Sequence, residues 1–194
     1  MTRRRYIQIG VGVLLLGVLA WGITKGLERL VAPPAASSNG SPAADSTPPA
    51  VAHITATFFY AAADGQALVP VHREVPLAEG VVPQGREILS MQLEAAPAPY
   101  LSAIPDGTML RAFYVTERGD AFVDLSSEAQ SGHAGGSATE LLTVYAIVNA
   151  VTANLPSIQR VQILIDGREA DTLAGHVDLR RPLQPDQSLV RNEG

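Results

Sequence analysis

The segment over residues 137–167 constrains the fold of this chain more than any other part. Its apolar residues recur at steps of three and four, the spacing of one stripe along a helix. These residues are Leu141, Val144, Tyr145, Val148, Val151 and Leu155. Pro156 ends the pattern, because the residue before a proline is pushed towards extended geometry. Residues 161–165 then alternate as in a strand, and Asp166-Gly167 is a strong turn signal.

The start of this helix has the form of a capping box, Ser137-x-x-Glu140. In such a box the serine oxygen accepts a hydrogen bond from the N–H three residues on. The glutamate side chain reaches back to the N–H of the capping residue. We therefore expect an amphipathic helix over residues 139–154 that is capped at its start by these two side chains.

The preceding hundred residues divide into two hairpins and one further helix. Strand formers dominate residues 54–61 and 68–73, and a second hairpin is indicated over 109–116 and 120–125. Residues 85–95 have the apolar spacing of a helix, which prolines end. Pro70 marks its strand as an edge strand, because proline donates no hydrogen bond to a ladder.

The expected order of elements is β-β-α-β-β-α-β. Helices placed between hairpins predict an α+β, two-layer domain in which an antiparallel or mixed sheet carries both helices on one face. One transmembrane helix is expected to precede this domain.

This pattern closely resembles the GerMN domain, which is named from a spore-germination protein. The resemblance rests on Glu140-Leu-Leu-x-Val-Tyr145, on the strand that ends at Asp166-Gly167, and on Leu173-Ala-Gly-His176-Val-Asp-Leu. It covers roughly residues 54–183. It implies a protein of the cell envelope without an established catalytic role, and a domain similar to the small α+β modules that build rings in sporulation and secretion channels.

The N-terminus predicts a membrane anchor. Residues 1–5 are basic, and residues 6–24 are almost entirely apolar and just long enough to cross a bilayer as a helix. The length of this run, and Pro33 after Ala32, favour an uncleaved anchor over a cleaved signal peptide. The arginines ahead of the run favour a cytoplasmic N-terminus. The remaining chain is then periplasmic or otherwise extracytoplasmic, attached to the inner membrane by a single pass.

The rest of the chain divides into three parts. Residues 25–52 form a linker rich in Pro, Ala and Ser, which cannot bury a core. Residues 53–183 form the globular domain, and the polar residues 184–194 are expected to be a disordered tail. Since the chain has no cysteine, neither a disulfide nor a lipid attached to cysteine holds it.

The charge of the exported part excludes one class of partner. The chain has 14 basic and 19 acidic residues, of which five basic and two acidic ones precede residue 46. The exported part thus keeps 9 basic and 17 acidic residues. Such an acidic surface argues against nucleic acid, whose phosphates require a basic face.

Five polar residues are candidates for a functional role. His176 with Asp178 and Asp166 has the side chains of a metal or acid–base site, but no second histidine is fixed near them. The alternative is that His176 and Asp178 bind the C-terminal segment to the sheet. Tyr145 and Asn149 lie one turn apart on the second helix, either as packed residues or as a polar spot that faces a partner.

Two weaker patterns complete the search for chemistry. His133 beside Ser131 suggests a nucleophile pair, but no G-x-S-x-G elbow is present. Asp124 and Glu128 suggest a glycosidase pair, although acids beside a turn are usually solvated. We therefore predict no catalytic residue, no metal and no cofactor, and regard an envelope hydrolase that uses His176 as the least favoured function.

The sequence thus predicts a membrane-anchored interaction domain of the bacterial cell envelope that is not an enzyme. It would bind another envelope protein or copies of itself. The alternative is an accessory module that binds peptidoglycan or sugar for cell-wall enzymes. That function needs an exposed aromatic platform, and Trp21, the one tryptophan, lies in the predicted anchor.

Overall fold

The computed structural model describes residues 52–191. The predicted anchor over residues 6–24 and nearly all of the linker lie outside this range. Within residues 52–191, none of the helices has both the length and the apolar character needed to span a bilayer.

The described residues form an α+β domain with the predicted order of its main elements. In chain order the elements are β1 His53–Ala61, β2 Leu68–Pro76, α2 Val81–Gln92, β3 Leu110–Val115, β4 Asp120–Leu125, α3 Glu128–Ser131, α4 Ser137–Asn154, β5 Arg160–Ile165, β6 Arg168–Glu169 and the 3-10 helix η1 Gln187–Leu189. The short elements α3, β6 and η1 were not predicted. They lie in segments whose polar, glycine-rich or proline-rich composition gives no periodic signal.

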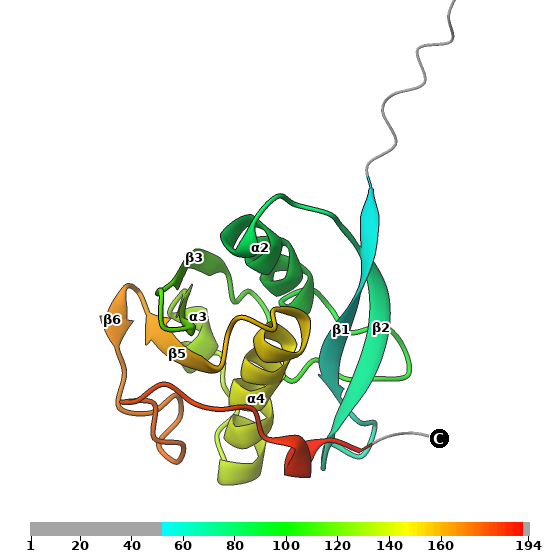
Figure 1. Cartoon of the computed structure of the whole chain (residues 1–194). Coiled ribbons are helices and arrows are strands. Elements are labelled where there is room, and N and C mark those ends of the chain that lie inside the picture. The colour runs from blue at the N-terminus through cyan, green and yellow to red at the C-terminus, as the bar shows by residue number, and fades with distance from the viewer. Residues whose placement is uncertain (1–51, 192–194) are drawn as a thin grey trace, which may run out of the picture. The chain divides into compact units, whose positions relative to one another are not determined.

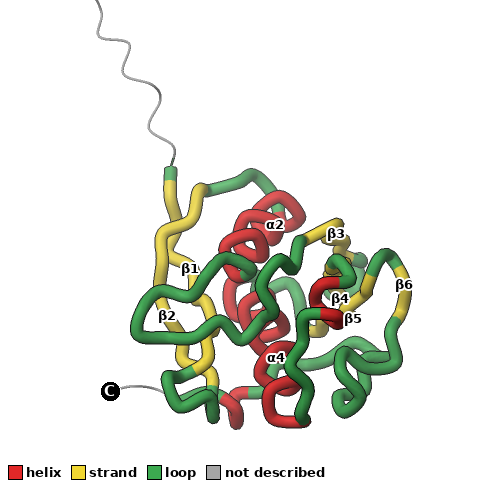
Figure 2. Tube along the Cα trace, turned by 180° about the vertical axis from the view of Figure 1, so that it is seen from behind, coloured by secondary structure: helices red, strands yellow, loops and turns green. Residues whose placement is uncertain are grey.

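The strands form two sheets, so the expectation of one sheet with both helices on one face is wrong. β1 and β2 pair as an isolated antiparallel hairpin, whereas the second sheet has the order β3-β4-β5-β6. β4 and β5 are parallel, and the other neighbours in that sheet are antiparallel. In Figures 1 and 2 the helices α2 and α4 lie between the hairpin and the larger sheet. The helices therefore have strands on two sides.

This arrangement buries α4 on nearly all its faces. Every residue from Leu142 to Val151 except Tyr145 is buried. α4 contacts β1, α2 and β5, so apolar residues are needed around the whole circumference. The prediction of one apolar stripe was therefore too narrow, because the hairpin covers the side that we expected to face solvent.

The predicted capping box is also wrong. Gly136 occupies the N-cap position of α4, and no side chain caps the helix. Gly136 has φ 91°, a conformation that glycine adopts without steric cost. The helix starts two residues earlier than expected, and Glu140 makes a different set of bonds.

Close packing of α2 on the larger sheet depends on Gly85. A Cβ atom added at Gly85 would lie 2.2 Å from the Cε1 atom of Phe113 on β3. The ring of Phe113 is completely buried. Gly85 therefore allows the helix backbone to lie directly on this ring.

The edge position predicted from Pro70 is confirmed. Pro70 lies on β2 opposite Phe59 of β1. The N–H of Phe59 points away from β2, because it donates to the side chain of Gln92. In an antiparallel ladder the nitrogen of Pro70 then also points away from its partner strand, where no donor is needed.

The chain remains ordered beyond Leu183, contrary to the expectation of a disordered tail from residue 184. Residues 184–191 continue across the domain, and Val190 forms a parallel bridge with Leu68 on β2. Arg191 forms an ion pair of 2.8 Å with Asp64. We call residues 173–191 the C-terminal strap. The ordered structure of the strap could not be predicted from its polar composition, because the strap bonds to side chains and strand ends that lie far away in the sequence.

Candidate functional site

The most elaborate polar site in the described residues surrounds Glu140 on α4. The residue is fully buried, and its carboxylate accepts four backbone N–H groups from the first turn of the strap. The donors are Leu173 at 2.9 Å, Ala174 at 2.8 Å, His176 at 2.8 Å and Val177 at 3.1 Å. The His176 ring also lies with its Nδ1 atom 3.1 Å from the carboxylate.

These bonds determine the charge state of Glu140. Burial by itself raises the pKa of this carboxyl, because it penalises the charged form. The N–H groups of Ala174, Val177 and His176 outweigh that effect and hold the pKa below its ordinary value. Glu140 is therefore a buried carboxylate that anchors the strap.

Asn149, one of the predicted residues, anchors the strap at a second point. It is fully buried, and its amide donates to the carbonyl of Asp186 and accepts from the N–H of Asp186, both at 3.0 Å. Tyr145 is half-buried one turn earlier, and burial together with the charge of Asp186 raises the pKa of its hydroxyl. Asn149 is therefore a packed residue that is hydrogen-bonded within the domain.

Two further carboxamides bind β1 in the same way. Gln92 at the end of α2 accepts from the Phe59 N–H and donates to the Phe59 carbonyl. Asn154 at the end of α4 does the same with Thr57. Both helices are thus attached to one strand through side-chain amides.

The residues His176, Asp178 and Asp166 do not share a site. His176 contacts Glu140, whereas Asp178 forms an exposed ion pair with Arg180 that lowers the pKa of its carboxyl. Asp166 lies in the turn between β5 and β6 and pairs with Arg111. Within residues 52–191 no group of three His, Cys, Asp or Glu side chains has the geometry of a metal site.

The weaker patterns are also explained by local structure. The Nδ1 atom of His133 accepts from the N–H of Gly135, and its Nε2 atom lies 3.2 Å from the Thr143 hydroxyl. Asp124 is buried, accepts from the N–H of Gly167 and pairs with Arg111. These side chains hold loops in place.

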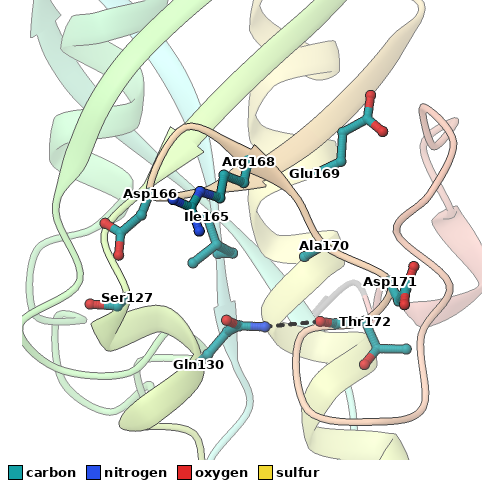
Figure 3. A pocket seen from close by; sticks show the side chains of 9 residues that line it. All are labelled: Ser127, Gln130, Ile165, Asp166, Arg168, Glu169, Ala170, Asp171 and Thr172. Atoms are coloured by element: carbon teal, nitrogen blue, oxygen red, sulfur yellow. Dashed lines mark hydrogen bonds between the residues drawn. The ribbon is translucent and has the colours of Figure 1, made fainter.

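A shallow pocket of about 460 Å³ lies beside the β5–β6 turn. Its lining comes from α3 and the residue before it, from the end of β5 and the β5–β6 turn, and from β6 and the residues after it: Ser127, Gln130, Ile165, Asp166, Arg168, Glu169, Ala170, Asp171 and Thr172. In Figure 3 Gln130 reaches the carbonyl of Thr172 with a hydrogen bond of 3.0 Å. Glu169 points away from Gln130 and Ile165. The lining has three acids, Asp166, Glu169 and Asp171, and one base, Arg168.

A second surface is apolar, and we call it the 93–110 surface. It has two hollows, of about 440 Å³ and about 250 Å³, lined by the segments that precede and follow residue 100. Leu101 lines the larger hollow and is 51% exposed, and Met109 lines the smaller one and is 62% exposed. Exposed apolar side chains that gather around hollows are typical of a contact surface.

Sequence reasoning missed the anchoring role of Glu140, Gln92 and Asn154. One signal was present for Glu140, which is followed by a long apolar run without a basic residue one turn away. An acid in that setting has no exposed partner on its helix and is a candidate for burial. Gln92 and Asn154 give no such signal, because their partners lie far away in the sequence.

Comparisons with known proteins identify a family and solved structures that this architecture resembles. The family model described as "Germane: Sporulation and spore germination" matches residues 57–171. The first GerMN domain of the sporulation protein GerM from Bacillus subtilis is 18% identical, with a TM-score of 0.51, over 69% of this chain and 96% of that one. No protein with a curated description matches this chain.

Two other solved structures are similar. The tandem GerMN domains of the same Bacillus subtilis protein are 18% identical with a TM-score of 0.51, and this chain covers 46% of their length and 70% of its own. A candidate lipoprotein from Clostridium perfringens is 22% identical with a TM-score of 0.49, over 71% of this chain and 91% of that one. The family model matches more than half of the 194 residues, and the chain therefore belongs to the Germane family, sporulation and spore germination, as the resemblance to GerMN domains predicted.

Proposed function

We propose that this protein is an interaction module of the bacterial cell envelope that contacts a partner protein, or a second copy of itself, through the 93–110 surface. The domain lies outside the cytoplasm and is held at the inner membrane by residues 6–24, with residues 25–52 as a spacer. Its family, its basic N-terminus and its apolar run support this assignment. The proposed function includes no catalytic step.

The observation that carries the proposal is the exposure of Leu101 and Met109 beside two hollows. Protein interfaces concentrate their binding energy in apolar side chains that fill pockets of the partner. The 93–110 surface offers both parts of such a contact, namely exposed apolar side chains and hollows that receive them. Methionine is also enriched at interfaces because its flexible side chain adapts to the partner.

Two acidic side chains lie at this surface. Glu94 and Asp106 line the smaller and the larger hollow respectively. Glu94 lies 3.5 Å from Arg73, which links the rim to the hairpin β1–β2. An apolar centre with a polar rim is the usual anatomy of a non-obligate interface.

Site-specific photo-crosslinking in cells tests the contact. A photoreactive residue at Met109 should give a discrete crosslinked product, whereas one at Glu87, which is exposed on α2, should give none. Met109→Glu combined with Leu101→Glu should abolish a product formed from a neighbouring exposed position. Equal crosslinking from Met109 and Glu87 would contradict the proposed surface.

The identity of the partner class follows from light scattering on residues 53–194 over a series of concentrations. A mass that rises with concentration, and returns to the monomer value in Met109→Glu, indicates contact between copies. A monomer at every concentration, together with a crosslinked product in cells, indicates a different envelope protein.

Paired reporter fusions at the C-terminus test the proposed location. A reporter that is active only outside the cytoplasm should be active on this chain, and one that is active only inside should be silent. The reverse pattern would overturn the topology. Deletion of residues 6–24 should release the protein from the membrane fraction.

A further inference from the structure

The sheet β3-β4-β5-β6 has one face without an apolar cover. Because strand side chains alternate, Ala121, Val123 and Leu125 of β4 point to the helices and belong to the core. The register places Asp120, Phe122 and Asp124 on the opposite face. We call this face, with its neighbours Tyr114 on β3 and Leu164 on β5, the outer face.

An aromatic pair lies at the centre of the outer face. Tyr114 is the direct cross-strand partner of Phe122, so their Cβ atoms are about 5 Å apart. Tyr114 is 57% exposed, and Phe122 and Leu164 are both partly exposed and lie outside the apolar core cluster of the described residues. The strap contacts this side of the sheet at Gln162, whose amide donates to the carbonyl of Leu179. Gln162 and Asp124 on this face are buried and Phe122 is partly exposed, so Tyr114 is the exposed ring of the pair.

An arginine–aspartate ion pair lies at each end of the strip of β4 from Asp120 to Asp124, which has Phe122 at its centre. At one end Arg160 binds Asp120 with two bonds, of 2.7 Å and 3.1 Å. At the other end Arg111 lies 3.3 Å from Asp124 and 3.3 Å from Asp166. A register shift between Leu110 and Ala112 marks a bulge, which explains how Arg111 reaches this face.

We propose that the outer face is a second binding site, separate from the 93–110 surface, and that it takes a neutral glycan chain. The rings of Tyr114 and Phe122 supply flat apolar surface for the C–H faces of sugar rings. The two ion pairs supply donors and acceptors for hydroxyl and acetamido groups at both ends. This site shares with the proposed function only the location outside the cytoplasm.

The charges on the outer face favour a neutral ligand. Two arginines stand against three aspartates, and each of them already has a partner. A charged ligand would need to break one of these pairs, whereas a polyhydroxylated ligand adds hydrogen bonds to pairs that remain intact. Since β4 rises about 3.3 Å per residue, the strip from Asp120 to Asp124 is about 13 Å long. A short segment of an extended glycan covers such a strip.

Co-sedimentation of the full chain in detergent with insoluble glycan tests this site. One arm uses purified peptidoglycan, and a second uses chitin, an insoluble and neutral chain of N-acetylglucosamine. A third arm adds soluble chitotetraose as a competitor. Tyr114→Ala is the test variant, and Leu77→Ala, a change at an exposed apolar residue outside both the outer face and the 93–110 surface, is its matched control. Thermal unfolding of both variants checks that the fold is retained.

The site predicts binding of wild type to both insoluble forms and competition by chitotetraose. Tyr114→Ala should weaken this binding about tenfold, because an aromatic contact contributes up to about that factor, and Leu77→Ala should bind as wild type does. Failure of wild type to bind chitin would overturn the proposal, as would equal binding by Tyr114→Ala. A protein that crosslinks to position 114 while no glycan binds would also overturn it and would make the outer face a protein interface. None of these outcomes depends on the 93–110 surface, so the two proposals fail separately.

Discussion

At the scale of single residues, the buried polar side chains of this domain bind backbone rather than ligand. Glu140 is the extreme case, because one carboxylate satisfies four N–H groups of a turn that has no strand or helix partner for them. A carboxylate is suited to this position since both of its oxygens accept hydrogen bonds and neither donates. The first turn of the strap therefore depends on the charge of one residue.

Replacing Glu140 with glutamine should destabilise the domain by about 2–4 kcal/mol. The amide keeps the shape of the side chain but turns an NH₂ group towards N–H donors, and some of these donors lose their acceptor. Urea unfolding of both proteins measures the difference. Glu87→Gln, the same change at an exposed helical site, is the control and should alter stability by less than about 0.5 kcal/mol. A Glu140→Gln protein as stable as wild type would show that the four bonds contribute little.

The same residue predicts how stability depends on pH. The pKa of folded Glu140 lies below the ordinary value of 4.5, so its contribution is complete above about pH 4.5. That contribution is lost as the pH falls through the pKa of the folded state. The stability gap between wild type and Glu140→Gln should therefore narrow as the pH falls below about 4.5. Asp178, whose pKa is also lowered, is present in both proteins, so a constant gap would contradict the assignment.

At the scale of elements, the contact between α2 and β3 determines whether replacing Gly85 with alanine stabilises or destabilises the domain. Glycine to alanine within a helix usually stabilises by about 1 kcal/mol. Gly85→Ala should instead destabilise by about 1–3 kcal/mol, because the new Cβ lies 2.2 Å from the Phe113 ring. Thermal unfolding measures this effect, with Ser90→Ala on the exposed side of α2 as control. Addition of Phe113→Leu should recover part of the loss, and stabilisation by Gly85→Ala alone would refute the close contact.

The elements with strong periodicity could be predicted from the sequence, and their partners could not. The pattern over 139–154 ends at Asn154 as the structure does, and β4 has the bounds that strand propensity indicated. The division into two sheets could not be predicted, because propensity does not say which strands pair. The burial of α4 on nearly all its faces could not be predicted for the same reason. Apolar residues on the second side of a helix can also be exposed, and only the pairing of the hairpin shows that they are covered.

The strap shows how a segment without periodicity is nevertheless held in place. Deletion of residues 184–194 should destabilise the domain by about 2–4 kcal/mol, because it leaves the amide of Asn149 buried and unpaired and removes the bridge from Val190 to Leu68. Denaturant titration measures the loss. Deletion of residues 192–194 alone is the control and should change nothing. Equal stability of both truncated proteins would mean that the strap ends at Leu183, as composition suggested.

At the scale of the whole molecule, Pro48–Gly194 is a compact unit of its own. Expressed without the preceding residues, it should unfold in one cooperative transition, as single domains of this size do. Calorimetry should give equal van't Hoff and calorimetric enthalpies. Two transitions, or failure to fold, would show that residues before Pro48 complete the core.

Of the candidate sites, the sequence indicated residue types but not their arrangement. Asn149 and His176 were identified, yet their partners Asp186 and Glu140 were not, since each pair is separated by more than thirty residues in the sequence. The outer face was not predicted from the sequence, because Tyr114 and Phe122 have the spacing of ordinary hairpin residues. Only the register of β3 and β4 brings the two rings together on a face without a cover.

The amides of Gln92 and Asn154 have a consequence for solubility. A strand at the edge of a sheet is a template on which another chain polymerises. A carboxamide carries the same donor and acceptor as a peptide unit, so Gln92 and Asn154 imitate a neighbouring strand along β1 at Phe59 and Thr57. Leu101 pairs with Ala61 in an isolated antiparallel bridge and so extends the cover of this edge. The helices thereby occupy the β1 edge of the isolated hairpin, where another chain would otherwise pair, without the addition of a third strand.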